Sequence, residues 1–63
     1  MSYRRDVLRK LEENGYTRLP RRGKGAHEVW SNGKRNQVVP AKIDDRNFAN
    51  EILKQAGIDH RFE

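Results

Sequence analysis

The sequence lacks cysteine and has few histidines, so two common ways of stabilising a small domain are absent. Without cysteine, neither a disulfide nor a thiolate metal site can form in these 63 residues. The two histidines, His27 and His60, are far apart and do not have the spacing of zinc ligands. We therefore expect no metal and no other cofactor. The lack of cysteine is also consistent with a cytoplasmic location, which is the location we expect.

Long apolar runs are missing as well. The N-terminal part of the chain holds no apolar stretch of the length that a signal peptide or a membrane span requires, so we expect no association with a membrane. The length allows one domain, covering residues 1–63. A chain of this size buries only about 60% of its unfolded surface, so its core must be small.

The positive charge is concentrated in the middle of the chain. The net charge is +5, and residues 18–35 hold one acidic residue, Glu28, against the basic residues Arg18, Arg21, Arg22, Lys24, Lys34 and Arg35. The rest of the chain is near neutral. Such a local excess favours binding to nucleic acid, to an anionic membrane surface or to an acidic protein. The structural alternative is a solvated basic loop that serves solubility.

The two ends of the sequence predict helices. Residues 2–14 have apolar residues at helical spacing, with Ser2 as a possible N-cap and Gly15 as the residue that ends the helix. Residues 46–56 form the second helix, capped by Asp44 or Asp45 and closed by Gly57 and Ile58. The apolar stripe of this helix is formed by Phe48, Ala49, Ile52, Leu53 and Ala56. Residues 59–63 are expected to be a polar tail, with His60 incidental.

Between the helices the pattern predicts strands at residues 17–21, 26–31 and 35–39. Asn32 and Gly33 favour a two-residue type I′ turn, which would pair Trp30 with Arg35 and His27 with Val38. We expect the face that carries His27, Val29 and Val38 to contact the core, with His27 at its margin. Trp30 and Arg35 would then share the other face as packing, as a cation–π pair or as a platform for stacking bases.

The resulting order is helix, three strands, helix. Short connections and two apolar stripes predict an α+β domain with an α-β-β-β-α order. Its three-stranded antiparallel sheet would carry both helices on one face and leave the other open to a partner.

Three segments resemble the HicA toxins. They are 23–27 (Gly-Lys-Gly-Ala-His) before a strand with an aromatic residue, 38–40 (Val-Val-Pro), and 52–58 (Ile-Leu-Lys-Gln-Ala-Gly-Ile). The resemblance extends from Val7 to Ile58. It implies a fold like that of double-stranded-RNA-binding domains and the activity of a ribosome-independent mRNA interferase. It also implies an adjacent HicB-like antitoxin that neutralises the toxin, and a functional histidine at His27.

One residue departs from the family pattern. HicA toxins usually have serine before the histidine, and this chain has Ala26. Loss of the hydroxyl would lower activity if it positions phosphate, and it would be tolerated if it only shapes the start of the strand.

The predicted chemistry is cleavage of mRNA through its own 2′-hydroxyl. An imidazole can act as base or acid near neutral pH, which suits His27 and requires no metal. Positive charge and backbone N–H groups would bind the RNA phosphates, and we assign this role to Arg21, Arg22, Gly23, Lys24, Gly25, Lys34 and Arg35. Tyr16 and Lys24 are the two candidates for the second proton-transfer group. Glu28 should point to the opposite sheet face from His27.

Three alternatives stand beside this interpretation. A lone histidine on a strand is often a half-buried residue that is hydrogen-bonded to backbone. A basic domain with an open sheet can bind RNA without cleaving it. The basic face can also dock an acidic protein, and a HicB-like antitoxin that covers the His27 face would inhibit a toxin by occlusion.

Overall fold

The computed structural model describes residues 2–20 and 27–63. Five of the predicted RNA-binding residues lie outside the described residues, and so does Ala26. These five are Arg21, Arg22, Gly23, Lys24 and Gly25. The elements are α1 (Arg4–Glu13), β1 (Thr17–Arg18), β2 (Glu28–Ser31), β3 (Asn36–Val39) and α2 (Arg46–Gln55). The predicted α-β-β-β-α order is confirmed.

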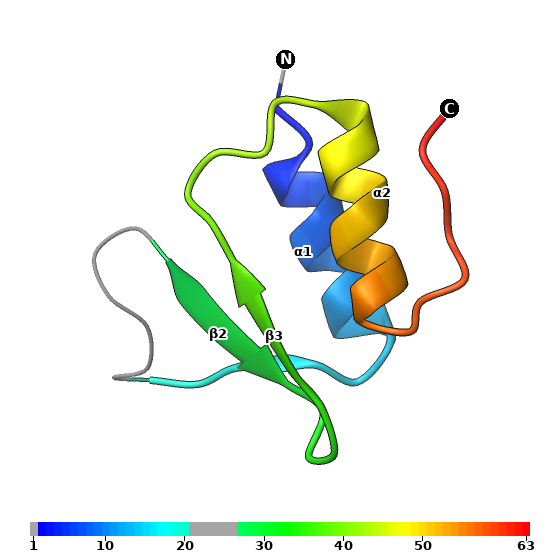
Figure 1. The fold of residues 1–63 in the computed structure, drawn as a ribbon. Helices are drawn as coiled ribbons and strands as arrows, with labels where there is room; N and C mark the ends of the chain where they lie inside the picture. Colours follow the sequence, from blue (N-terminus) through cyan, green and yellow to red (C-terminus); the bar gives the residue numbers. More distant parts are fainter. Residues whose placement is uncertain (1, 21–26) are drawn as a thin grey trace.

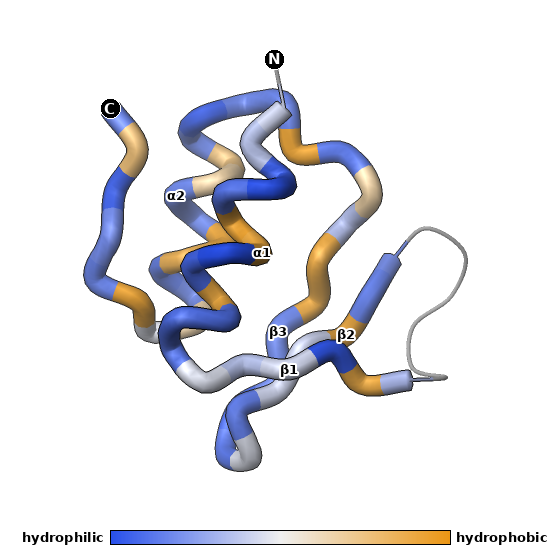
Figure 2. Tube along the Cα trace, turned by 180° about the vertical axis from the view of Figure 1, so that it is seen from behind, coloured by the Kyte–Doolittle hydropathy of each residue, from blue (hydrophilic) through white to orange (hydrophobic). Residues whose placement is uncertain are grey.

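The molecule has two layers. The three strands form an antiparallel sheet in the order β1-β2-β3. Figure 1 shows α1 and α2 side by side on one face of this sheet, and the opposite view in Figure 2 shows the same arrangement. The other face of the sheet carries no element among the described residues. Within the part of the chain that is described, no helix is long and apolar enough to cross a membrane.

The hairpin between β2 and β3 has a longer turn than predicted. Ser31 pairs with Asn36 and Trp30 with Gln37, a shift of two residues from the predicted register. The cause is Asn32, whose side-chain oxygen accepts hydrogen bonds from the backbone N–H groups of Lys34 and Arg35 at 2.9 and 2.7 Å. An Asn side chain that takes up backbone donors in this way builds a turn by itself. The two-residue type I′ turn is therefore wrong.

The sheet also presents its other face to the helices. A shift of two residues keeps the same residues on each face, but the buried face carries Trp30, Gln37 and Val39, which are 8%, 6% and 0% exposed. Val38 is 51% exposed, so the predicted core face is wrong. An indole buries far more area than a valine, and the face that carries Trp30 gains more by contacting the helices.

Both helices end as the glycines predict. Gly15 has φ +84°, and the N–H groups of Gly15 and Tyr16 donate to Glu12 and Leu11 carbonyls in α1. Gly57 has φ +74°, and the N–H groups of Gly57 and Ile58 donate to Lys54 and Leu53 carbonyls in α2. These are paired bonds of the Schellman type.

The starts of the helices agree in part with the prediction. Asp45 caps α2, since its carboxylate accepts the N–H of Asn47 at 3.3 Å. At α1 the N-cap position is held by Tyr3 rather than Ser2. The Ser2 hydroxyl still accepts the N–H of Arg4 at 3.2 Å.

The core lies between the helix pair and the sheet. Its buried apolar residues are Val7, Leu11, Tyr16, Trp30, Val39, Ile43, Ala49, Ile52, Leu53, Ala56 and Ile58. Phe48, predicted to belong to the α2 stripe, is 43% exposed. The expected polar tail is attached to the domain: Phe62 packs against Tyr3 with ring centroids 5.4 Å apart, and the Asn50 amide bonds to both the N–H and the C=O of Phe62.

Candidate nucleic-acid interface around His27

His27 lies immediately before β2 and its side chain is exposed. The structural alternative of a half-buried histidine is therefore wrong. Side chains alternate between the two faces of a strand, and the alternation of β2, continued by one residue beyond Glu28, assigns His27 to the open face together with Val29. A side chain at this position is accessible to a large substrate such as RNA.

An apolar row crosses the open face beside His27. The Leu19 N–H donates to the Val29 carbonyl at 2.8 Å, and Val29 pairs with Val38 on β3. A polar row of Thr17, Ser31 and Asn36 lies next to it. Trp30, considered above as a stacking platform, is buried on the other face. Aromatic side chains are the usual stacking partners of bases, and the open face carries none of them among the described residues.

Lys34 and Arg35 lie at the opposite end of the hairpin from His27. The 4 residues of β2 separate the two ends, and at about 3.3 Å per residue the separation is on the order of 15 Å. The Arg35 guanidinium donates from Nη1 to the Gln55 carbonyl at 3.1 Å, and so caps the C-terminal end of α2. The structure therefore does not bring Lys34 and Arg35 into the immediate surroundings of His27.

Glu28 is the centre of a charged cluster on the helix side of the sheet. Its carboxylate accepts the Trp30 indole N–H at 3.1 Å and lies 2.9 Å from Arg4 Nη2 and 3.6 Å from Arg18 Nε. The hydrogen bond from Trp30 is the main cause that lowers the pKa of Glu28 below 4.5, and the charges of Arg4 and Arg18 lower it further. Glu28 therefore points away from the His27 face, as predicted.

Arg4 and Arg18 were not predicted as partners of Glu28. The two arginines come from α1 and β1, distant in sequence from Glu28. No periodicity or motif in the sequence connects them, so only the folded arrangement reveals the cluster.

Tyr16 cannot serve as the second proton-transfer group. It is 2% exposed, and its hydroxyl donates to the Ala56 carbonyl at 2.7 Å. This bond connects the segment after α1 to the end of α2, inside the core. The other candidate, Lys24, lies outside the described residues.

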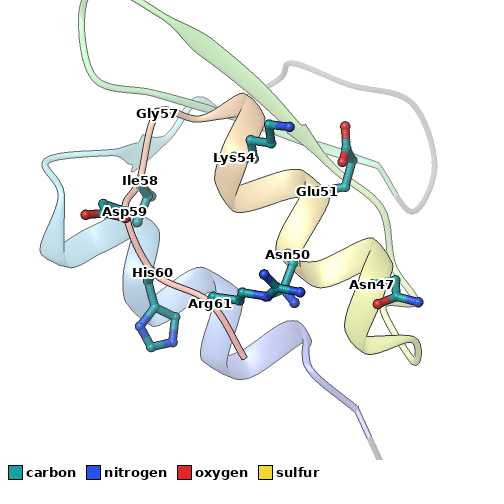
Figure 3. Close-up of a pocket in the computed structure, with 9 residues that line it drawn as sticks. All are labelled: Asn47, Asn50, Glu51, Lys54, Gly57, Ile58, Asp59, His60 and Arg61. Carbon is teal, nitrogen blue, oxygen red and sulfur yellow. The ribbon is translucent and has the colours of Figure 1, made fainter. Parts of the chain in front are cut away.

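His60 belongs to a different surface. It lies in the C-terminal segment, which runs along the helix layer on the side away from the sheet (Figure 1). A hollow between this segment and α2 is drawn in Figure 3, and its lining includes Lys54 and Arg61 together with Glu51 and Asp59. The mixed charges give this hollow no preference for an anion.

No protein-family model, no curated protein and no solved structure matches the chain at a significant level. The resemblance to HicA toxins therefore stays a prediction that rests on the residues of this chain.

Proposed function

We propose that the chain is a HicA-like toxin, a metal-independent endoribonuclease that cleaves mRNA with His27. The observation that supports this most strongly is the exposed position of His27, directly before β2 of an α-β-β-β-α domain. The sequence just before it supplies the basic residues Arg21, Arg22 and Lys24. An enzyme that acts on a polyanion needs an accessible reactive group and positive charge near it, and the exposed His27 and the basic sequence before it are consistent with this.

In the proposed reaction, His27 acts as base or acid at the scissile phosphodiester. A base removes the proton of the 2′-hydroxyl, the 2′-oxygen bonds to phosphorus, and the bond to the 5′-oxygen breaks as that oxygen gains a proton. Lys or Arg side chains near the phosphate stabilise the charge of the transition state. The second proton-transfer group is not assigned, because the Tyr16 hydroxyl is buried in the core.

A HicB-like antitoxin is the proposed protein partner, acting in the cytoplasm. The apolar row of Leu19, Val29 and Val38 favours a protein on the open face, since these side chains offer area for burial and no platform for bases. A partner bound there would cover His27 and exclude RNA. The basic charge of the chain would speed association with an acidic partner.

The second candidate function is a non-catalytic RNA-binding module. Ala26 favours it, because it replaces the serine usual before the histidine in HicA toxins. Binding by such a module would be steeply dependent on salt, since phosphate contacts dominate the affinity.

The test is RNA cleavage by purified protein in EDTA, with wild type, His27→Ala and His60→Ala compared. His60→Ala is the matched control, because it removes the other histidine of the chain, which lies in the C-terminal segment with its ring centroid 4.9 Å from that of Phe62. We expect cleavage by wild type and His60→Ala and loss of cleavage in His27→Ala. Because the His27 side chain is exposed, we expect the free energy of unfolding of His27→Ala to differ from that of wild type by no more than about 0.5 kcal/mol. Urea unfolding followed by circular dichroism measures this difference.

Two results would argue against this proposal. Equal cleavage by wild type and His27→Ala would remove His27 from the reaction. Salt-dependent binding without cleavage, in wild type and also in Ala26→Ser, would favour the binding module.

A further inference from the structure

The Glu28 cluster, formed by Glu28, Trp30, Arg4 and Arg18, connects the three elements α1, β1 and β2 at one point. Arg4 is the first residue of α1, Arg18 the last of β1 and Glu28 the first of β2. Arg4 also donates from Nε to the carbonyl of Pro40, directly after β3, at 3.2 Å. The start of β2 is thus linked to the helix layer and to both neighbouring strands.

The contacts in the cluster differ in strength. The Arg4 and Glu28 side chains are 27% and 23% exposed and 2.9 Å apart, whereas Arg18 is 63% exposed and 3.6 Å away. Exposed pairs at longer distance contribute little, because water screens them and long side chains lose freedom. Arg4 and the indole N–H of Trp30 are therefore the partners that fix the Glu28 carboxylate.

This arrangement has a consequence for His27, which is joined to Glu28 by one peptide bond. Glu28 pairs with Val39 on β3, and the bonds of its carboxylate to Arg4 and Trp30 hold the same residue on the helix side. The direction in which His27 leaves the strand on the opposite face then follows. An exposed side chain has few contacts to define its position, and Glu28 is the neighbour of His27 among the residues that the structure describes.

We propose that Glu28 is a positioning residue, held by Arg4 and Trp30, that orders His27 for its reaction with RNA. The catalytic part of this inference rests on the proposed function, and the structural part does not. Glu28 does not contact the substrate, since it lies on the covered face of the sheet. Its effect reaches the reaction through the backbone at the start of β2.

The first measurement is the backbone order of His27 by ¹⁵N relaxation in wild type, Glu28→Ala, Glu28→Gln, Arg4→Ala and Arg18→Ala. Rigid backbone has an order parameter of about 0.85 and flexible backbone falls below about 0.6. We expect His27 to be rigid in wild type and to lose order in Glu28→Ala and Arg4→Ala. Glu28→Gln keeps an oxygen that accepts from Trp30 and Arg4, so it should retain most of the order.

Arg18→Ala is the matched control. It removes an arginine that faces the same carboxylate, but one with a longer and more exposed contact. We expect His27 to keep its order in this variant. If Glu28→Ala does not fold, the order of His27 in Arg4→Ala compared with Arg18→Ala tests the same proposal.

The second measurement is the kinetics of RNA cleavage at a temperature where every variant is folded by circular dichroism. A misplaced catalytic group can lower the rate about 100-fold, so we expect kcat to fall by that order in Glu28→Ala and Arg4→Ala. KM should change less than about twofold, because the residues assigned to RNA binding are untouched. Glu28→Gln should recover most of kcat.

The outcomes separate the two proposals. Unchanged order of His27 in both Glu28→Ala and Arg4→Ala overturns the positioning role, whether or not the wild type cleaves RNA. Lost order together with unchanged kcat overturns its catalytic part. A wild type that leaves RNA intact overturns the proposed function alone, and the relaxation data then decide whether Glu28 orders His27.

Discussion

Substitution of Tyr16 by phenylalanine tests whether this residue serves the fold or the chemistry. The change removes one hydroxyl and leaves the ring. In the structure that hydroxyl donates to the Ala56 carbonyl at 2.7 Å, and Tyr16 is 2% exposed. The removed hydrogen bond therefore joins two buried parts of the chain, and the Tyr16 hydroxyl is not accessible to RNA.

The expected loss of stability follows from what remains after the substitution. A hydrogen bond within a protein contributes about 1 kcal/mol net, and an acceptor left buried without a partner costs about 1–3 kcal/mol. Ala56 is 5% exposed, so water reaches its carbonyl poorly. We expect a loss of about 1.5 kcal/mol in the free energy of unfolding. For a domain of this size that corresponds to a fall of about 10 °C in Tm.

Urea unfolding followed by fluorescence measures this loss, because Trp30 is the only tryptophan and is buried in the core. The m-value should stay constant, which indicates that the same surface is exposed on unfolding. Cleavage by folded Tyr16→Phe should equal that of wild type. Unchanged stability would refute the inference that the buried Tyr16–Ala56 hydrogen bond stabilises the fold. Loss of cleavage without loss of stability would show that the Tyr16 hydroxyl takes part in the reaction.

Two further predictions concern stability. The Glu28 pKa is lowered by the Trp30 hydrogen bond and by the Arg4 and Arg18 charges, so its contribution is present above pH 4.5 and is lost as the pH falls through the folded-state value. Wild type should therefore lose stability relative to Glu28→Gln in acid urea titrations, and parallel curves would contradict this. Gly57→Ala should lower the free energy of unfolding more than Gly15→Ala. Both glycines have a positive φ, so an alanine costs about 1 kcal/mol at either position. A Cβ at Gly57 would also lie 2.6 Å from Arg35 Nη1, so Arg35 must move away from the Gln55 carbonyl to which it donates. Equal losses in urea would mean that the Arg35 contact with Gln55 contributes nothing.

The features that could be predicted from sequence are those determined by short segments. Gly15 and Gly57 end their helices because the backbone there takes a positive φ that glycine adopts without strain. Asp45 caps α2 because its carboxylate is within reach of a backbone N–H two residues later. The exposure of His27 does not belong to this class, because the face that carries it was expected to contact the core.

The strand register and the buried face of the sheet are not determined by short segments of sequence. Asn32 is compatible with a two-residue turn, through its backbone conformation, and with a longer turn, through hydrogen bonds of its side chain. The same sequence therefore allows two strand registers. Both faces of the hairpin carry apolar residues, Val29 and Val38 on one and Trp30 and Val39 on the other. The helices cover the face of Trp30, whose indole has more area to bury, and the Glu28 cluster follows because Trp30, Arg4 and Arg18 then lie on one side.

Two arginines of the chain, Arg4 and Arg35, are engaged by contacts within the fold. Arg4 is held by Glu28 and the Pro40 carbonyl, and Arg35 by the Gln55 carbonyl. These guanidinium groups stabilise the helix side of the domain, so the net charge of +5 overstates the cations that are oriented towards a phosphate. His27 lies on the opposite face, at the end of a basic stretch of sequence. If RNA is cleaved there, the reacting group and the arginines that hold the fold lie on opposite faces of the sheet and are connected through the peptide bond between His27 and Glu28.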